Sequence, residues 1–448
     1  MQTKEYLGRS VALLGLGRSN RAVLDFLLPL GAVPTVYVPK EPPEDLAALY
    51  RAQGVRFAVG AFPARFAEAL LVRSPVIRPD LPALAASVAA GAELTSEVEL
   101  FLRHCPATVV GITGSDGKTT TSALTAKLLT GAGKHTRLGG NNGVPLLPQV
   151  WEMTADHVAV LELSSFQLMT LERAPHVAVI TNITPNHLDW HTDMAEYVAA
   201  KSRILGTRTR FFVTNAAQTL IQNTADGVEI PRALFSANGE LPRDCSMALT
   251  VQGDRLCVVQ NGTEAWHDTA AFHLPGRHNF ENLMAAFAAV TAVLGRQPAL
   301  AALADFHGVA HRLQYVDTVR GVRFYNSSID TSPTRTAAAL DALGGRPIVI
   351  AGGKGKGIPL DALADALAKH VKAVVLYGET AEEIAVLLHG RAPTHCVRAF
   401  AAAFHTAAAL ASAGDTVLLS PGCTAFDQFR DFEERGNVFC ALVAGLKE

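Results

Sequence analysis

The first hundred residues begin with a short apolar run, a glycine turn, a stretch of helical periodicity and a second apolar run, which together span residues 10–38. This order predicts a β-α-β unit. Gly15 and Gly17 allow a tight turn and let a phosphate approach the N-terminus of the following helix. An NAD site would need a third glycine where Asn20 stands and an acid where Val38 stands, so the turn favours another nucleotide or a plain β-α turn.

Apolar runs and helical stretches alternate in the rest of the chain as well. Around residues 107–141 a strand, a glycine-rich loop and a helix follow one another, and residues 157–165 and 176–183 are apolar runs that turn polar where they end. A long amphipathic helix is predicted at 273–295, and from residue 346 apolar runs alternate with Ala-rich helical stretches. The alternation predicts parallel sheets and an α/β fold class in every region.

Composition narrows the class of protein. The chain has 448 residues, 49% hydrophobic and 18% charged, which is enough apolar material for two to four ordered domains. A formal net charge of −2 argues against a broad nucleic-acid surface. Its six cysteines form no CxxC pair, so we expect reduced thiols. No apolar run reaches the ~20 residues of a membrane span and no signal peptide is evident, so we expect a cytoplasmic protein. As a separate expectation, we take the protein to be a monomer.

Residues 111–120, GITGSDGKTT, have the character of a phosphate-binding loop between a strand and a helix. Gly114 and Gly117 let backbone N–H groups point at phosphate oxygens, Lys118 is placed to reach the β and γ phosphates, and the Thr119 hydroxyl is a ligand for Mg²⁺. The loop reads GxTGxxGK[ST] rather than the general GxxxxGK[ST] form. The other predicted ATP-binding residues of the loop are Ser115, Asp116 and Thr120. We expect the Asp116 carboxylate to point away from the phosphates or to cap the turn.

Polar residues also gather where two further predicted strands end. Glu162 ends one apolar run, and a buried carboxylate usually needs a partner or a metal. After the next run come Asn182, Asn186, His187, Asp189 and His191. Because the carboxyl ends of parallel strands share one edge of a sheet, we expect these side chains to lie beside the phosphate loop.

These motifs resemble the ATP-dependent Mur ligases of peptidoglycan synthesis. The phosphate loop, the strand-end Glu162, and NHLDWH followed by EYVAAKSRI carry the resemblance. GGNNGVPL, LPGRHNFENLMAA, AHRLQYV and LLSPGCTAFDQFRDFEERGNVF are similar to segments of the members that add D-glutamate to UDP-N-acetylmuramoyl-L-alanine. The similarity extends over nearly the whole chain and is weakest in the first hundred residues. It implies an acyl-phosphate intermediate made with ATP, followed by attack of an amino acid's amine.

The resemblance implies roles for the central cluster. Lys118 would clamp the phosphates, Thr119 and Glu162 would hold one Mg²⁺, and His187 a second Mg²⁺ or the substrate carboxylate region. Lys201 would be carbamylated by CO₂, which converts a cation into an anion able to bind Mg²⁺. The other implied contacts are Asn282 to adenine, Arg312 to the ATP phosphates, Ser19 and Ser74 to the acceptor, Asn141 to the acceptor or the nucleotide phosphates, and Thr331, Lys356, Ser420 and Phe432 to the amino acid.

The resemblance also implies three domains that meet at one cleft. We expect a Rossmann-like acceptor-binding domain at residues 1–96, a central P-loop ATPase-type domain with a parallel sheet at 97–308, and a Rossmann-like amino-acid-binding domain at 309–448. Reaction would require the last domain to approach the other two, so we expect a hinge near residues 306–314.

Several positions depart from the family pattern. Val38 and Val76 replace an acid and a glycine near the expected uridine site, and Ser327 replaces an Asp that would contact the ATP ribose, with Asp330 as a candidate substitute. Ala425 stands where a Ser often touches glutamate, and Thr424 is its neighbour. None of these positions lies in the phosphate loop or the predicted metal cluster.

Three other functions remain open at this point. A Mur-type amide ligase with a different amino acid or acceptor would explain the altered N-terminal positions. A nucleotide-binding regulator without activity would not need Lys118, Glu162, His187 and Lys201 together. A P-loop kinase or motor would not need the C-terminal SPGCTAFDQF region.

Overall fold

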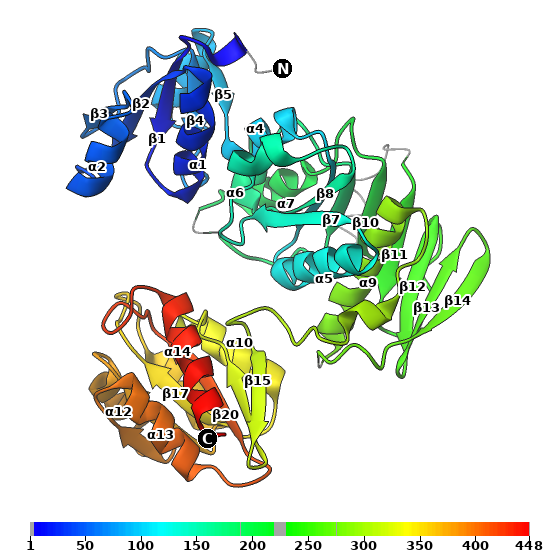
Figure 1. The fold of residues 1–448 in the computed structure, drawn as a ribbon. Coiled ribbons are helices and arrows are strands. Elements are labelled where there is room, and N and C mark those ends of the chain that lie inside the picture. The colour runs from blue at the N-terminus through cyan, green and yellow to red at the C-terminus, as the bar shows by residue number, and fades with distance from the viewer. Residues whose placement is uncertain (1–3, 189, 219–229, 275, 448) are drawn as a thin grey trace. The chain divides into compact units, whose positions relative to one another are not determined.

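A computed structural model describes residues 4–188, 190–218, 230–274 and 276–447 (Figure 1). The chain divides into two compact units, Met1–Phe306 and His307–Glu448. The first unit contains two sheets and the second contains one. The mixed α/β class predicted from the alternating pattern is confirmed.

The N-terminal sheet is parallel, with the strand order β3-β2-β1-β4-β5. Helices α1 and α2 cover one face and α3 the other. The elements are η1 (Lys4–Tyr6), β1 (Ser10–Leu14), α1 (Arg18–Leu27), η2 (Leu28–Leu30), β2 (Val33–Val38), α2 (Glu44–Arg51), β3 (Arg56–Val59), β4 (Leu70–Arg73), α3 (Pro82–Ala89) and β5 (Glu93–Thr95). The β-α-β unit predicted at residues 10–38 is present as β1, α1 and β2.

The central sheet has nine strands in the order β14-β13-β12-β11-β10-β9-β6-β8-β7. Its strands are β6 (Thr108–Thr113), β7 (His135–Gly140), β8 (His157–Glu162), β9 (Val177–Ile180), β10 (Phe211–Asn215), β11 (Arg232–Ser236), β12 (Met247–Gln252), β13 (Arg255–Gln260) and β14 (Thr263–Asp268). Its helices are α4 (Glu97–His104), α5 (Lys118–Gly131), η3 (Leu147–Glu152), α6 (Ser165–Leu168), α7 (Met194–Ser202), α9 (Arg277–Leu294) and η4 (Leu300–Leu303).

Helices α5 and α9 pack side by side on one face of the central sheet (Figure 1). Helices α4, α6 and α7 contribute to the apolar cluster on the other face. That second cluster continues without a break into the N-terminal sheet, from Leu161 and Ile180 to Val11 and Phe26. The shared core explains why the first two predicted domains form one compact unit, and the boundary between residues 96 and 97 stays a prediction.

The expectation of wholly parallel sheets was wrong at one edge of two sheets. Strands β12, β13 and β14 are antiparallel, and so are β15 and β16. Asn261 and Gly262, with φ of 51° and 77°, join β13 to β14, and Arg320 and Gly321, also with φ of 51° and 77°, join β15 to β16. Two consecutive residues with positive φ make the turn that suits a tight hairpin, and a hairpin forces the strands to run antiparallel.

The second unit has a six-stranded sheet in the order β15-β16-β20-β17-β18-β19, parallel apart from the β15–β16 edge. Helices α13 and α14 cover one face, and α10, α11 and α12 the other. The elements are β15 (Gln314–Val319), β16 (Val322–Asn326), α10 (Pro333–Leu343), β17 (Ile348–Gly352), α11 (Asp361–His370), β18 (Ala373–Tyr377), α12 (Ala381–Leu388), β19 (Thr394–Cys396), α13 (Phe400–Leu410), β20 (Thr416–Gly422) and α14 (Phe432–Gly445).

Candidate active site

The phosphate loop follows β6, which lies between β8 and β9 in the central sheet. The loop needs glycine at two positions, because Gly114 and Gly117 have φ of 149° and 79°. A Cβ on Gly114 would lie 1.9 Å from Thr181 Oγ1, and one on Gly117 would lie 2.2 Å from Asn282 Oδ1. The loop therefore packs directly against α9, which carries Asn282.

Polar contacts fix the shape of the loop. The Ser115 hydroxyl donates to Thr184 O and contacts Tyr197 Oη, both at 2.9 Å, and Asp116 N donates to Asn182 Oδ1 at 2.9 Å. Ser115 thus has its side chain turned into the protein, while the Asp116 side chain is exposed. Thr119 and Thr120 are half-buried at the start of α5.

Two lysines meet at the base of the loop. Lys118 Nζ donates to Gly114 O at 2.8 Å and to Ser115 O at 2.7 Å. Lys201 Nζ also donates to Gly114 O at 2.8 Å, and lies 4.7 Å from the centre of the Tyr197 ring. Lys201 is 2% exposed, and burial, reinforced by the charge of Lys118, lowers its pKa well below the ordinary value. A buried amine of this kind favours the neutral form.

Glu162 ends β8 beside the loop, as the sequence pattern predicted. Its side chain is 2% exposed, and its Oε1 accepts a hydrogen bond from Asn141 Nδ2 at 2.9 Å. Its Oε2 is buried without a hydrogen-bond partner among the described residues. An orphaned carboxylate oxygen next to a phosphate loop fits a metal ligand, because a bound cation would satisfy it. Among the described residues no cluster of three or more His, Cys, Asp and Glu side chains has metal-binding geometry, so Mg²⁺ would also need hydroxyl and phosphate oxygens.

The segment after β9 divides into residues with different environments. His187 has φ of 55°, and its ring lies 5.0 Å from that of Phe166. His191 is buried, with Nε2 2.9 Å from Ser165 Oγ and Nδ1 3.2 Å from Glu196 Oε2. Its two ring nitrogens are therefore occupied within the protein, while Asn182 supports the loop through Asp116. Asn186 is half-buried, and Asp189 lies outside the described residues.

Two of the predicted acceptor residues, Ser19 and Ser74, belong to the N-terminal sheet region, whereas Asn141 follows β7 of the central sheet. Ser19 and Ser74 are half-buried, and the turn that contains Gly15 approaches Ser74 closely, since a Cβ on Gly15 would lie 3.9 Å from Ser74 Cβ. Val38 is 6% exposed and belongs to the apolar core, whereas Val76 is 68% exposed. Val38 therefore has a packing role and no polar atom to offer a uridine.

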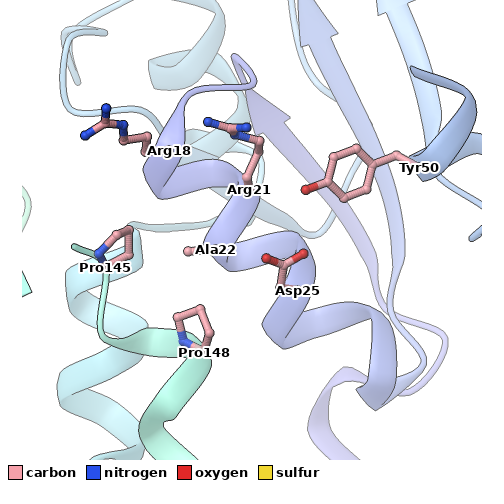
Figure 2. Close-up of a pocket in the computed structure, with 7 residues that line it drawn as sticks. All are labelled: Arg18, Arg21, Ala22, Asp25, Tyr50, Pro145 and Pro148. Atoms are coloured by element: carbon pink, nitrogen blue, oxygen red, sulfur yellow. The ribbon is translucent and has the colours of Figure 1, made fainter. Parts of the chain in front are cut away.

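A cavity of about 300 Å³ lies along α1, between Tyr50 of α2 and the loop that leads into η3 (Figure 2). Arg18, Arg21 and Asp25 project from α1 on this side, and Ala22 lies between them (Figure 2). The remaining lining residues are Tyr50, Pro145 and Pro148. Burial raises the pKa of Asp25, while a hydrogen bond with Tyr50 and the charge of Arg21 lower it. The sequence pattern did not single out these two arginines.

The second unit gathers most of the predicted amino-acid-binding residues in one region. Lys356 Nζ donates to Thr331 Oγ1 at 3.0 Å, and burial and then the charge of Arg335 lower the pKa of Lys356. Ser420 is fully buried, and its hydroxyl donates to Asp330 Oδ2 at 2.8 Å. Phe432 begins α14, and its ring centre lies 6.1 Å from that of His311. The Ser420 hydroxyl is therefore directed at Asp330, and Arg335, which sequence analysis did not single out, lies close enough to Lys356 to affect its pKa.

Asp330 joins this region to the expected hinge. The carboxyl is 5% exposed, and burial raises its pKa to about 6, although Ser327, Ser420 and Arg312 lower it. Ser327 Oγ in turn accepts a hydrogen bond from Leu313 N at 3.1 Å. Arg312 is thus electrostatically linked to Asp330 inside the second unit. Ala425, which departs from the family pattern, and its neighbour Thr424 are both buried.

Comparison with known proteins identifies the family. The Mur ligase middle domain matches residues 112–290, and the Mur ligase, glutamate ligase domain matches residues 311–423. The chain is 38% identical to a UDP-N-acetylmuramoylalanine--D-glutamate ligase of Ruminiclostridium cellulolyticum, over 99% of this chain and 98% of that protein. It is 37% identical to the protein of the same name from Clostridium kluyveri, over 97% and 96% of the two chains. The chain belongs to the Mur ligase family.

Solved structures agree on the fold of this Mur ligase. A UDP-N-acetylmuramate-alanine ligase of Thermotoga maritima has a TM-score of 0.57 at 19% identity, over 98% of this chain and 99% of that one. A MurF ligase of Thermotoga maritima in complex with ADP has a TM-score of 0.55 at 15% identity, over 99% and 97%. These structures share the α/β architecture with a central ATP-binding domain. No helix in the described part of this Mur ligase is long and apolar enough to cross a membrane.

Proposed function

We propose that this Mur ligase joins D-glutamate to UDP-N-acetylmuramoyl-L-alanine at the expense of ATP, in the cytoplasmic synthesis of peptidoglycan precursors. The proposal rests on relatives that are named for that reaction. They are 36–38% identical to this chain along nearly its full length. The resemblance found in the phosphate loop and in the C-terminal motifs supports it independently of the N-terminal positions that differ.

The reaction would run in two steps. An oxygen of the acceptor carboxylate attacks the γ-phosphorus of ATP, the bond from that phosphorus to the bridging oxygen breaks, and ADP leaves. The amine of D-glutamate then attacks the acyl carbon, a tetrahedral intermediate forms, phosphate departs and the nitrogen loses a proton. Both steps place negative charge on phosphoryl or acyl oxygens, so cations and N–H donors around those oxygens lower the barrier.

The phosphate loop supplies those donors in the proposal. In the absence of ATP, Lys118 Nζ donates to the carbonyl oxygens of Gly114 and Ser115, at 2.8 and 2.7 Å. When ATP binds, the same ammonium group would donate to the β and γ phosphates instead. Thr119, Glu162 and His187 would hold Mg²⁺, which would neutralise charge on the phosphates and orient them. Glu162 fits this role because its Oε2 is buried without a protein partner among the described residues.

Lys201 would contribute as a carbamate. The neutral amine attacks the carbon of CO₂, the nitrogen releases one proton, and the side chain becomes an anion. The proposal is supported by the burial of Lys201, by its lowered pKa and by the nearby Lys118, since a second ammonium there is unfavourable. A carbamate in the same place would attract both Mg²⁺ and Lys118.

The second unit would hold the amino acid. Lys356 and Thr331 are 3.0 Å apart and offer an ammonium and a hydroxyl to a carboxylate. Phe432 would limit the same site, and Ser420 would support it through Asp330, 2.8 Å away. Arg312, in the same unit, would contact the ATP phosphates, and Asn282, beside Gly117, would contact the adenine.

A panel assay tests the proposal. Purified protein is mixed with ATP, Mg²⁺ and UDP-N-acetylmuramoyl-L-alanine, and ADP release and product mass are measured for each amino acid in turn. We expect release with D-glutamate and a product heavier by one glutamyl residue. Release with another amino acid but not with D-glutamate would reject the proposed specificity and leave an amide ligase of this family.

A ligase with a different acceptor is the second candidate, and the environment of Val38 favours it. This side chain is buried in the apolar core, so the polar contact that the family makes from this position has no counterpart here. The same assay with a panel of UDP-linked acceptors and D-glutamate separates the two candidates.

A further inference from the structure

The loop after β4 and the segment after β9 hold each other through two side chains. We call residues 74–80 the acceptor loop and residues 187–188 and 190–196 the His187 segment. Arg78 of the acceptor loop donates from Nη1 to Trp190 O at 2.7 Å and from Nη2 to Glu196 Oε1 at 2.8 Å. Its guanidinium lies over the Trp190 ring, 5.0 Å from the ring centre. One side chain thus makes three different contacts with the His187 segment.

The His187 segment also donates a hydrogen bond to the acceptor loop. Trp190 Nε1 donates to the carbonyl oxygen of Val76 at 3.0 Å, so each side contributes a donor to the backbone of the other. Bidentate and stacked guanidinium contacts fix orientation as well as distance, which a single ammonium would not do. Glu196 also accepts from Thr192 N at 2.8 Å, so the carboxylate that receives Arg78 shapes the segment itself.

A second arginine joins the acceptor loop to Phe166, whose ring packs against those of Trp190 and His187. Arg73 is 1% exposed, and it donates to Ile77 O at 2.6 Å and to Phe166 O at 2.5 Å. The Phe166 ring lies 4.5 Å from that of Trp190 and 5.0 Å from that of His187. The acceptor loop, α6 and the His187 segment therefore share one set of packed side chains inside the first unit.

We propose that Arg78 and Trp190 are positioning residues that lock the acceptor loop to the His187 segment, so that the acceptor site and the catalytic side chains keep a fixed separation. The inference rests on the proposed function, which assigns the acceptor to Ser74 and a metal or carboxylate contact to His187. Neither Arg78 nor Trp190 needs to touch a substrate. Displacing the acceptor carboxylate by even 1 Å from the γ-phosphate costs turnover, so the lock acts on binding and on rate together.

The experiment compares Arg78→Ala, Trp190→Phe and the double variant with Arg51→Ala. Arg51 is a matched control in the same sheet domain, because it also pairs with two carboxylates, Glu41 and Glu44, and lies over a ring, that of Phe57. Steady-state kinetics give kcat and the KM for the UDP-linked acceptor and for ATP. Thermal unfolding checks that each variant is folded. If Arg78→Ala does not fold, Arg78→Lys, which keeps the charge, replaces it.

We expect Arg78→Ala to raise the acceptor KM and lower kcat by about tenfold each, with a much smaller change in the KM for ATP. Trp190→Phe keeps the ring but removes the Nε1 donor, so its effect should be smaller, and the double variant should resemble Arg78→Ala alone. Arg51→Ala should match the wild type. Unchanged kinetics in Arg78→Ala, or multiplicative effects in the double variant, would overturn the proposal.

A binding measurement separates this inference from the proposed function. Trp151→Phe/Trp266→Phe leaves Trp190 as the sole tryptophan of the chain, so its fluorescence reports on the His187 segment. Titration with UDP-N-acetylmuramoyl-L-alanine should change this fluorescence, and Arg78→Ala should abolish the change or require about tenfold more ligand. No D-glutamate is present, so an enzyme that used another amino acid would still give this result. A titration identical with and without Arg78 would contradict the lock.

Discussion

Lys118 and Lys201 donate hydrogen bonds to the same acceptor, the carbonyl oxygen of Gly114, each at 2.8 Å. Two ammonium groups so close together repel each other, and the buried one has the larger cost because it has lost its water. Lys201 is 2% exposed and none of its hydrogen-bond partners is a carboxylate. The pair therefore favours a neutral Lys201 amine next to a charged Lys118, which is the state that reacts with CO₂.

The first prediction concerns that reaction. Wild-type protein in ¹³C-bicarbonate should show a carbamate carbon resonance that is lost in Lys201→Ala, because the signal needs the Nζ nucleophile. The same variant should lose activity by at least ~100-fold, since the proposed carbamate, which would hold Mg²⁺ and Lys118, cannot form, and bicarbonate should not restore it. Lys127→Ala, which removes a half-buried lysine paired with Asp305, is the control and should keep both signal and activity. Near-normal turnover in Lys201→Ala would reject the role.

The second prediction concerns the glycines of the phosphate loop. Gly117→Ala should raise the KM for ATP by at least about tenfold, because the new Cβ would lie 2.2 Å from Asn282 Oδ1 and would push the loop away from α9. Gly133→Ala separates the clash from backbone strain. Gly133 also has a positive φ, 84°, yet a Cβ there meets nothing within 4 Å. This control should cost only ~1 kcal/mol of stability and leave the KM unchanged. Equal KM values in the two variants would count against the contact between Gly117 and Asn282.

Part of this site follows from sequence alone, for a physical reason. A glycine-rich loop between a buried strand and a helix has few possible conformations, and strand ends in a parallel sheet share an edge, so the sequence could predict that the phosphate loop and Glu162 follow neighbouring strands. The direction of a side chain in an irregular segment has no such periodicity. The His191 ring contacts the half-buried Glu196, and the Ser420 hydroxyl donates to the buried Asp330, and neither direction could be read from the sequence.

The missed features depend on contacts between distant segments. Arg78 and Trp190 are 112 positions apart, and Arg335 affects Lys356 only because the chain just before α10 folds against the loop after β17, through Thr331 and Lys356. By contrast, the antiparallel edge at Asn261 and Gly262 had a local signal, the Asn-Gly pair between two apolar runs, which the sequence interpretation did not use.

The third prediction concerns the amino-acid site. Lys356→Met should raise the KM for D-glutamate by about 10- to 100-fold, because a charged hydrogen bond to a carboxylate is worth ~1.5–3 kcal/mol. The KM for ATP should change little. Thr331→Val should have a smaller effect in the same direction, because it removes the hydroxyl that Lys356 contacts at 3.0 Å.

Lys354→Met is the control for this site. Lys354 lies in the same glycine-rich loop and is exposed, as Lys356 is, but it faces Glu379 at 3.9 Å instead of Thr331. It should leave the KM for D-glutamate unchanged. If Lys354→Met and Lys356→Met gave the same increase, general loss of positive charge in the loop would explain the result and the assigned contact would be wrong.

The last prediction concerns how stability depends on pH. Burial raises the pKa of Glu97 from 4.5 to about 7, and the backbone N–H groups of Leu147 and Leu146 lower it by less. Between these pH values the native state keeps a proton that the unfolded chain has released, so the free energy of unfolding should fall as pH rises from 4.5 to 7. The loss is on the order of 3 kcal/mol, from about 1.4 kcal/mol per pH unit.

Urea unfolding at several pH values measures this loss. The Glu97→Gln variant should not show it and should be more stable than the wild type at pH 7. Glu172→Gln, at an exposed position, should keep the wild-type slope. Parallel curves for Glu97→Gln and the wild type would show that Glu97 is already ionised in the folded protein.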